Sequence, residues 1–263
     1  MPKRRTHWFI LLSFFLILLF VVYLLMIPDP SKLKKENPPK TALMEYRQKA
    51  SKGKTYRISQ IWVPFSKISP YLIKAVLIAE DDKFWRHEGF DYEAIQKAIE
   101  KDLKAKKFKF GGSTITQQLA KNLYLSPEKS MIRKIPEAFI TWRIEKVLSK
   151  RRILELYLNI AEWGEGIFGA EAASRHYFGK PSSQLTPEEA ARLASVLPNP
   201  KKYNPVGDQR YVTNRSNLIY SIMIQRGIII PEYKEVVEGL NSSFPEGIIS
   251  PLPFSKGEDN PSY

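Results

Sequence analysis

The chain has 263 residues, a formal net charge of +14 and no cysteine. Its length suffices for one sizeable domain with its own hydrophobic core. The lack of cysteine excludes disulfides, thiol nucleophiles and thiolate zinc sites, and the charge indicates an anionic partner, either nucleic acid or an anionic lipid.

The N-terminal region predicts a membrane anchor. Residues 8–27 form a run of twenty residues without a charge, which is the length needed to cross a bilayer. Three basic residues precede the run, so the positive-inside rule predicts a cytoplasmic N-terminus and an exported domain. We expect an uncleaved single-pass anchor rather than a signal peptide, because residues 26–30 offer no small-residue cleavage site. An exported domain does not meet nucleic acid, so we expect a bilayer or anionic lipid partner.

The remaining chain divides into three parts. Residues 28–57 are rich in proline, lysine and polar residues and predict a linker, with a short helix near 42–50. Residues 58–227 predict one mainly α domain, behind a cytoplasmic tail at 1–7 and the anchor. Residues 228–263 form a C-terminal tail that contains five prolines and no recognisable motif.

Capping residues mark the expected helices within the domain. Ser69-Pro70 is an N-cap with proline at the first helical position. Thr186 and Glu189 form a capping box, and Gly227 is a stop signal. Strand signals are few, so we expect an all-α core. The predicted helices span residues 71–82, 92–106, 127–148, 151–161, 190–197 and 209–226.

Two blocks within the domain carry polar groups that an ordinary packed helix does not need. The first, residues 80–89, is acidic and aromatic, and the second, residues 111–123, opens with Gly-Gly-Ser-Thr. A helix N-terminus after two glycines offers free N–H groups to an anion, although a plain loop and N-cap is the alternative reading. Between the blocks, residues 97–110 hold six lysines with Phe108 and Phe110. They form either a solvated charged face or a flap that contacts the membrane.

Together with three blocks that follow them in the chain, these two blocks resemble the five ordered motifs of the peptidoglycan glycosyltransferases. Those enzymes polymerise lipid II into glycan strands. The later blocks are Arg133–Glu137, Arg152–Asn159 and Glu162–Ala173. The last has the form typical of the monofunctional enzymes, and no transpeptidase motif set accompanies it. The similarity runs from about residue 61 to residue 226. It implies a mainly α, lysozyme-like domain and a membrane-dipping region at 97–110.

The chemistry of joining two sugars requires a carboxylate base for the acceptor hydroxyl and cations for the diphosphate that leaves. Glu80 is the candidate base. If a helix continues through the first block, then Phe84 and His87 lie on the same face as Glu80. We expect Phe84 and the adjacent Asp81 to raise the pKa of Glu80, and His87 to hold geometry by hydrogen bonding. The alternative for Glu80 is a solvated acidic helix end.

The candidate cations are Lys121, Lys129, Arg133 and Lys134. At helical spacing, Lys129, Arg133 and Glu137 form a single stripe, which is otherwise an ordinary surface ion-pair ladder. The resemblance implies that Lys121, Arg133 and Lys134 line a diphosphate cleft and that Glu137 matches a second essential glutamate. Glu137 would order the cations or a divalent cation such as Mg²⁺ or Mn²⁺. No organic cofactor is expected.

Other polar residues complete the expected site. Pro136 is expected to kink its helix just before Glu137. Glu155 and Asn159 either brace the floor of the cleft or serve packing alone. The residues expected to contact substrate, besides the cations, are Asp81, Phe84, His87, Ser113, Thr114, Gln117, Gln118 and Asn122.

The resemblance implies lipid II and the growing lipid-linked glycan as partners, with other cell wall synthesis or division proteins as further candidates. The enzyme would sit in the bacterial inner membrane with its domain on the periplasmic side. One alternative is a membrane-anchored lysozyme-like hydrolase or lytic transglycosylase, which would not need cations around a diphosphate. Another is a non-catalytic glycan-binding scaffold, and the presence of both Glu80 and Glu137 argues against it.

Overall fold

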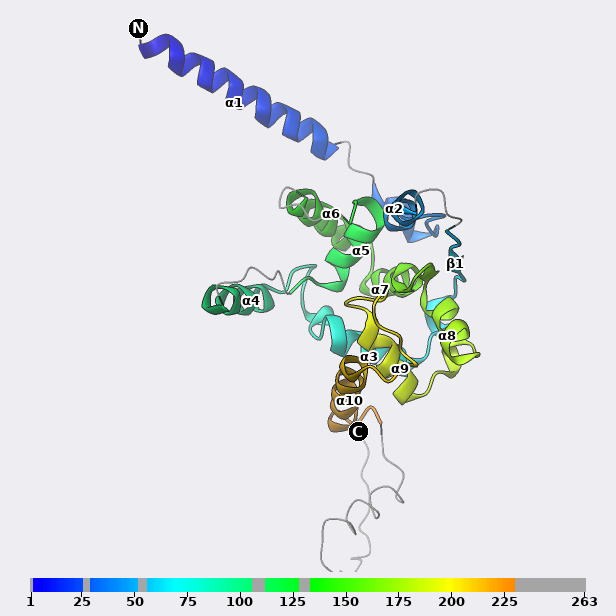
Figure 1. The fold of residues 1–263 in the computed structure, drawn as a ribbon. Coiled ribbons are helices and arrows are strands. Elements are labelled where there is room, and N and C mark those ends of the chain that lie inside the picture. The colour runs from blue at the N-terminus through cyan, green and yellow to red at the C-terminus, as the bar shows by residue number, and fades with distance from the viewer. Residues whose placement is uncertain (1, 26–28, 52–55, 106–111, 128–132, 230–263) are drawn as a thin grey trace, which may run out of the picture.

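The protein is mainly helical in a computed structural model that describes residues 2–25, 29–51, 56–105, 112–127 and 133–229 (Figure 1). The helices are α1 (Pro2–Leu25), α2 (Ala42–Ala50), α3 (Pro70–Glu80), α4 (Tyr92–Ala105), α5 (Ile115–Tyr124), α6 (Lys134–Val147), α7 (Lys150–Ile160), α8 (Ala170–Phe178), α9 (Pro187–Val196) and α10 (Arg210–Gln225). Short 3-10 helices are η1 (Pro30–Lys34), η2 (Phe65–Lys67), η3 (Phe84–Arg86) and η4 (Ser182–Gln184). The mainly helical fold expected from the sequence is confirmed.

The local signals at helix ends operate as expected at several positions. The Ser69 side chain accepts a hydrogen bond from the N–H of Tyr71 at the start of α3. Thr186 and Glu189 form the predicted capping box of α9. Helix α10 ends before Gly227, which has a positive φ of 66°. Capping therefore predicted the start of α3 and the end of α10 to within one residue and the start of α9 to within three.

The start of the helix that contains Pro136 was predicted wrongly. Helix α6 begins at Lys134, and residues 128–132 lie outside the described part of the chain. Pro136 therefore lies in the first turn of α6, where a backbone N–H has no partner within the helix. Its missing N–H breaks no intrahelical hydrogen bond, so the expected kink before Glu137 has no cause.

The core lies where two groups of helices meet. Helix α5 packs against α6 and α7, while α9 packs against both α3 and α10. The largest fully buried side chains are Trp163, Tyr157 and Phe84. Tyr157 and Phe84 both come from the blocks that we expected to form the site, so the core and the site share residues.

A small sheet was missed by the sequence analysis. Strands β1 (Ser59–Gln60), β2 (Glu162–Gly164) and β3 (Ile167–Phe168) have the order β1-β3-β2. Strand β1 is parallel to β3, and β2 is antiparallel to it. Two- and three-residue strands are too short to show a period of two, so no alternation could reveal them.

Gly169 allows the fifth block to pack closely beneath α7. It follows β3 with φ of 84° and ψ of 149°, a combination that is essentially restricted to glycine. A Cβ atom there would lie 2.6 Å from the carbonyl oxygen of Asn159. The fifth block therefore approaches the backbone of α7 closely at this position.

Residues 28–57 are not a simple linker, and this expectation is wrong where the segment is described. Leu33 of η1 and Met44 of α2 are buried. Arg152 of α7 donates hydrogen bonds to the carbonyl oxygens of Leu33 at 2.8 Å and of Glu36 at 2.9 Å. The apolar side chains of these short helices are buried against the domain, so the folded unit begins well before residue 58.

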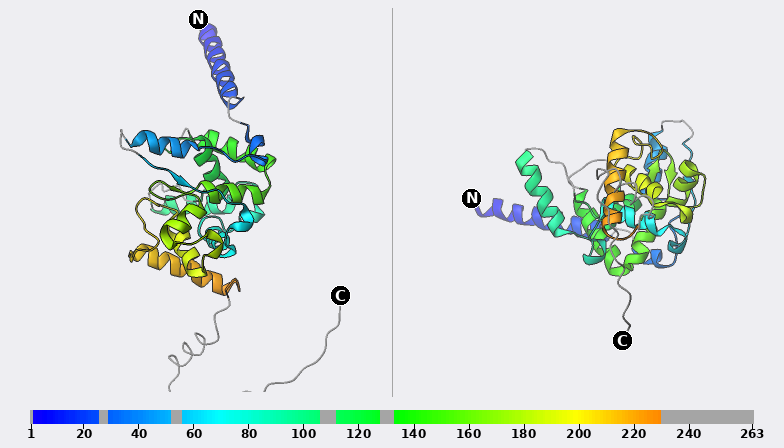
Figure 2. Two further views of the ribbon diagram at one scale, coloured as in Figure 1. Left: turned by 90° about the vertical axis from the view of Figure 1, so that its right-hand side faces the viewer. Right: turned by 90° about the horizontal axis from the view of Figure 1, so that it is seen from below.

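Helices α1 and α4 stand apart from the rest of the molecule. Helix α1 projects from the end opposite α10, as Figure 1 and the left-hand view of Figure 2 show. Helix α4 extends outward in Figure 1 and in the right-hand view of Figure 2. Within the residues that the structure describes, no helix has the combined length and hydropathy of a membrane span.

Candidate active site

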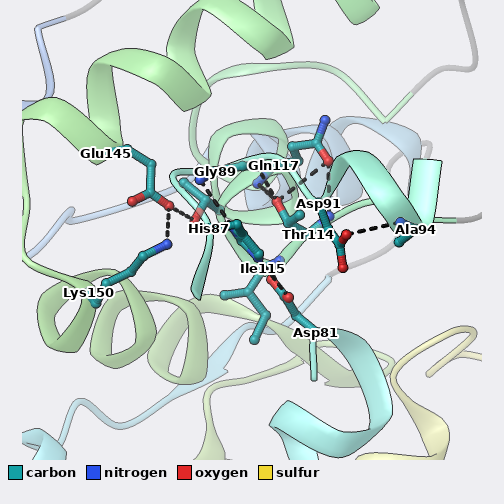
Figure 3. A network of polar contacts seen from close by, with 11 residues as sticks. Asp81, His87, Gly89, Asp91, Ala94, Thr114, Ile115, Gln117, Glu145 and Lys150 are labelled. Carbon is teal, nitrogen blue, oxygen red and sulfur yellow. Dashed lines mark hydrogen bonds and ion pairs between the residues drawn. The ribbon is translucent and has the colours of Figure 1, made fainter. Parts of the chain in front are cut away.

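A network of polar contacts joins the end of α3 to the start of α5 (Figure 3). Asp81 directly follows α3, and its Oδ2 accepts a hydrogen bond from the N–H of Ile115 at 2.9 Å. Its Oδ1 lies 2.9 Å from Nε2 of His87, while Nδ1 of His87 accepts from the N–H of Gly89 at 3.1 Å. Since Nδ1 of His87 is an acceptor, the ring hydrogen is on Nε2, and Nε2 donates a hydrogen bond to Asp81. The hydrogen-bonding geometry expected of His87 is confirmed.

The chain does not continue as a helix through the first block, so the shared face predicted for Glu80, Phe84 and His87 is wrong. Helix α3 ends at Glu80, and Asp81 adopts φ of −163° and ψ of 76°. The contacts of Asp81 explain the break, because its carboxylate reaches Ile115 only when the backbone leaves the helix. Phe84 is fully buried and packs edge-on against His87.

Thr114 and Gln117 are occupied in capping α5. Oγ1 of Thr114 accepts from the N–H of Gln117 at 3.2 Å, and Oε1 of Gln117 accepts from the N–H of Thr114 at 3.0 Å. Oγ1 of Thr114 also donates to the carbonyl oxygen of Gly89 at 2.7 Å. Both side chains are buried. These contacts give the pair a structural role where we expected substrate contacts.

The two carboxylate oxygens of Glu80 differ in their hydrogen bonding. Oε2 accepts from Nε2 of Gln118 at 2.9 Å, and Oε1 of Gln118 accepts from the hydroxyl of Tyr157 at 3.0 Å. Oε1 of Glu80 is buried and has no hydrogen-bond partner among the described residues. Nη2 of Arg215 lies 3.5 Å from that oxygen. Glu80 therefore presents one fixed oxygen and one oxygen free to accept a proton.

The pKa of Glu80 is raised, and burial is the largest cause. The hydrogen bond from Gln118 and the charges of Arg215 and Lys121 act in the opposite direction. Asp81 raises the pKa as expected but is the smallest of these influences. A carboxylate with a raised pKa suits a general base better than a solvated one, so the solvated helix end is the poorer description.

A cavity of about 250 Å³ lies next to Gln118, the hydrogen-bond partner of Glu80. Gln118, Lys121 and Asn122 of α5 line it together with Arg133 and Tyr157. These three α5 residues share one face of the helix, because Lys121 and Asn122 follow Gln118 by three and four positions. The sequence analysis placed Gln118, Lys121, Asn122 and Arg133 in the site, and the structure brings all four to this cavity.

Lys121 and Arg133 of the cavity wall lie near a further cation, Lys134, and one buried carboxylate. Glu137 is 1% exposed and pairs through Oε1 with the ammonium of Lys134. Burial lowers the pKa of Lys121, the charge of Glu137 raises it, and Arg133 and Lys134 lower it further. Nζ of Lys134 lies 3.4 Å from Oγ of Ser113. The positive charges therefore outnumber the acid and repel one another.

The predicted stripe along the third block is only partly described. Arg133 is the N-cap of α6, and its Nη1 donates to the carbonyl oxygen of Ser126 at 2.8 Å. The carbonyl oxygen of Arg133 accepts from the N–H of Glu137 at 3.1 Å, as in a first helical turn. Lys129 lies outside the described residues, so its place in the stripe stays a prediction.

The described side chains do not fit a resident divalent cation. Among them, no group of three or more His, Asp or Glu residues is close enough to hold a metal ion. Oε2 of Glu137 is buried and has no hydrogen-bond partner in the described part of the chain. However, the charged groups around Glu137 are cations, which oppose metal binding.

Glu155 and Asn159 fasten a neighbouring segment. Asn159 donates from Nδ2 to the carbonyl oxygen of Val63 at 2.9 Å and accepts through Oδ1 from the N–H of Val63 at 2.9 Å. Oε2 of Glu155 accepts from the N–H of Phe65 at 3.0 Å. These contacts favour the structural role of Glu155 and Asn159, in which both residues serve packing alone.

Several residues of the site were missed by sequence reasoning. Arg47 of α2 pairs with Glu162 at the edge of the cavity, with Nη2 2.6 Å from Oε2. Arg47 lies in the segment that we read as a linker, so it carried no local signal. Tyr157 lies within the fourth block, but the neighbouring residues did not indicate its hydrogen bond to Gln118. Arg215 lies outside all five blocks.

The comparisons with known proteins agree on one family. A model of the transglycosylase family matches residues 47–224. A protein of Nitrosospira multiformis named biosynthetic peptidoglycan transglycosylase is 44% identical over 227 residues, covering 86% of this chain and 98% of that protein. A protein of the same name from Azoarcus sp. is 52% identical over 206 residues, covering 76% of this chain and 88% of its own length.

We predict that Asp81→Asn lowers the free energy of unfolding by about 1–3 kcal/mol, because an amide offers one acceptor oxygen where two N–H donors converge. Asp82→Asn is the matched control, since Asp82 is half-exposed and pairs with Arg226, a contact worth about 0–1 kcal/mol. Urea denaturation of both variants measures the difference. Equal losses would contradict a special role for Asp81.

Proposed function

Because the chain belongs to the transglycosylase family and is a peptidoglycan glycosyltransferase of cell wall synthesis, we propose that it polymerises lipid II with Glu80 as the general base. The observation that carries this proposal is the free, buried Oε1 of Glu80, a residue joined by hydrogen bond to the wall of a cavity that Lys121 and Arg133 also line. The other oxygen is fixed by Gln118, a residue that also lines the cavity.

The reaction follows from this arrangement. The 4-hydroxyl of the acceptor sugar gives its proton to Oε1 of Glu80 as its oxygen attacks C1 of the donor sugar. The bond between C1 and the diphosphate oxygen breaks, and the lipid diphosphate leaves with the electron pair. Lys121, Arg133 and Lys134 neutralise the charge that develops on it. A diphosphate leaves without a proton, so no general acid is needed.

Glu137 has a supporting role in this proposal. Its pairing with Lys134 holds that ammonium at the start of α6, close to Ser113. A hydrolase would use a second carboxyl group to protonate its leaving group. Here the second carboxylate is instead paired with a cation, which favours transfer from a diphosphate over glycan hydrolysis.

We further propose that residues 8–27 anchor the enzyme in the inner membrane, with the domain on the periplasmic side. The support is the charge-free sequence and the three basic residues before it. Large apolar side chains of α1 are exposed, such as Trp8 at 74% and Phe9 at 68%, and exposure of so many in water is unfavourable. Residues 97–110 stay a predicted membrane contact, and residues 106–110 lie outside the described part of the chain.

Glu80→Gln is expected to reduce polymerisation of labelled lipid II by about 10²–10⁴-fold, because the amide cannot accept the proton. Burial raises the pKa of Glu80, so the ionised carboxylate destabilises the fold above that pKa. The variant should therefore match or exceed the parent in melting temperature at pH 8, and this advantage should vanish as the pH falls through the pKa.

The control for this change is Glu93→Gln, which alters a glutamate that is 71% exposed. Its polymerisation rate should stay within a few-fold of the parent. Parental activity in Glu80→Gln would remove Glu80 from the role of base.

Lys121→Ala and Arg133→Ala are each expected to lower the rate by about 10²–10³-fold, since each removes a charge aimed at the leaving group. Binding of a soluble disaccharide-peptide without the diphosphate should hardly change. Lys74→Ala, at an exposed position of α3, is the matched control for both measurements. If the analogue without diphosphate loses as much affinity as lipid II, the cations act on the fold instead.

Deletion of residues 1–27 tests the anchor. Membranes that carry the full-length protein should retain it after an alkaline carbonate wash, whereas the truncated protein should be released, because it lacks the apolar run that spans the bilayer. Retention of the truncated protein after the wash would assign membrane insertion to another segment.

A further inference from the structure

Arg215 of α10 and Arg226, the C-cap residue of that helix, both contact the end of α3 or the residues that follow it. Nη2 of Arg215 donates to the carbonyl oxygen of Ala79 at 3.0 Å and lies 3.5 Å from Oε1 of Glu80. Three turns later, Arg226 binds the carboxylate of Asp82, with Nη2 3.0 Å from Oδ2. The packing of α10 against α3 and α9 fixes the helix in this place. One helix outside all five sequence blocks therefore contacts the residues on both sides of Asp81.

We propose that Arg215 is a positioning residue for Glu80, which it holds ionised with Oε1 directed at the acceptor hydroxyl. This inference rests on the proposed role of Glu80 as general base. It adds a residue that neither the five blocks nor their spacing identifies.

The first support is the contact of Arg215 with the backbone. The last carbonyl groups of a helix lack partners within the helix, and the negative end of the helix dipole favours a cation there. By binding the carbonyl oxygen of Ala79, Arg215 fixes its guanidinium at the turn that carries Glu80. The distance between the guanidinium and the carboxylate is therefore set by a backbone atom rather than by a flexible ion pair.

The second support is the difference between the two oxygens of Glu80. Gln118 occupies Oε2 with a hydrogen bond of 2.9 Å. The 3.5 Å from Arg215 to Oε1 is within reach of an ion pair but too long for a good hydrogen bond. Arg215 thus attracts the ionised carboxylate and leaves a lone pair of Oε1 free for the incoming proton.

Other charges around Glu80 cannot replace this effect. Lys121 of α5 acts in the same direction as Arg215 but more weakly. Asp81, next in sequence, acts in the opposite direction. Tyr157 of α7 is fully buried and stays protonated, because burial raises its pKa well above 10. Removal of Arg215 therefore leaves the desolvation of Glu80 less opposed, and the pKa of Glu80 must rise.

The test is the pH dependence of kcat/KM for lipid II polymerisation by the full-length protein in detergent. Arg215→Met keeps the length of the side chain and removes its charge. We expect a lower kcat and an acid limb moved to higher pH by about one unit, as for loss of a neighbouring opposite charge. Arg215→Lys retains the charge, so it should return the acid limb to the parental position and recover part of kcat.

Arg226→Met is the matched control. It removes the other arginine that α10 extends to this loop, yet Arg226 pairs with Asp82 and not with Glu80. Its acid limb should coincide with that of the parent. A shift equal to that of Arg215→Met would mean that any weakening of α10 moves the limb, and this would overturn the proposal.

The remaining outcomes separate this inference from the assignment of the base. If Glu80→Gln is inactive but Arg215→Met and Arg215→Lys keep the parental acid limb, Arg215 has no positioning role and Glu80 stays the base. If Glu80→Gln retains parental activity, both the base and its positioning residue are wrong.

Discussion

The hydrogen bonds that converge on Asp81 are the constraint on which the site depends. They end α3 at Glu80 and set the first N–H of α5 against the same carboxylate. A carboxylate at a helix N-terminus is favoured by the helix dipole. Once this junction is fixed, Gln118 lies one turn into α5, within reach of Glu80. The geometry of the proposed base is therefore a consequence of how two helices are joined.

Positive charge is in excess in and next to the cavity, and this excess favours a bound anion. Lys121, Arg133 and Lys134 share one buried acid, Glu137. Burial and mutual repulsion both act against the charged form of Lys121. Glu80 is also disfavoured as an anion by its burial. Such a site reduces the stability of the free fold, and an anionic ligand that offsets the excess positive charge recovers part of the loss.

The segment before the recognisable motifs contributes a wall of this site. Helix α2 places Leu43 and Arg47 at the cavity, and Arg47 is tied to Glu162 in β2. The small sheet, in turn, is packed under α7 through the close approach at Gly169. The folded unit therefore includes η1 and α2, whose residues Leu33 and Met44 are buried.

The sequence by itself determined the helical class, several helix ends, and the set Gln118, Lys121, Asn122 and Arg133 that meets at the cavity. Capping and helical faces depend on residues within about four positions, so a sequence displays them. Tertiary structure decided the rest. The bonds from Asp81 to Ile115, from Gln118 to Glu80 and from Arg215 to Ala79 span 34, 38 and 136 residues. Such contacts depend on where whole helices pack, which is why Arg215, far from every block in sequence, reached the proposed base.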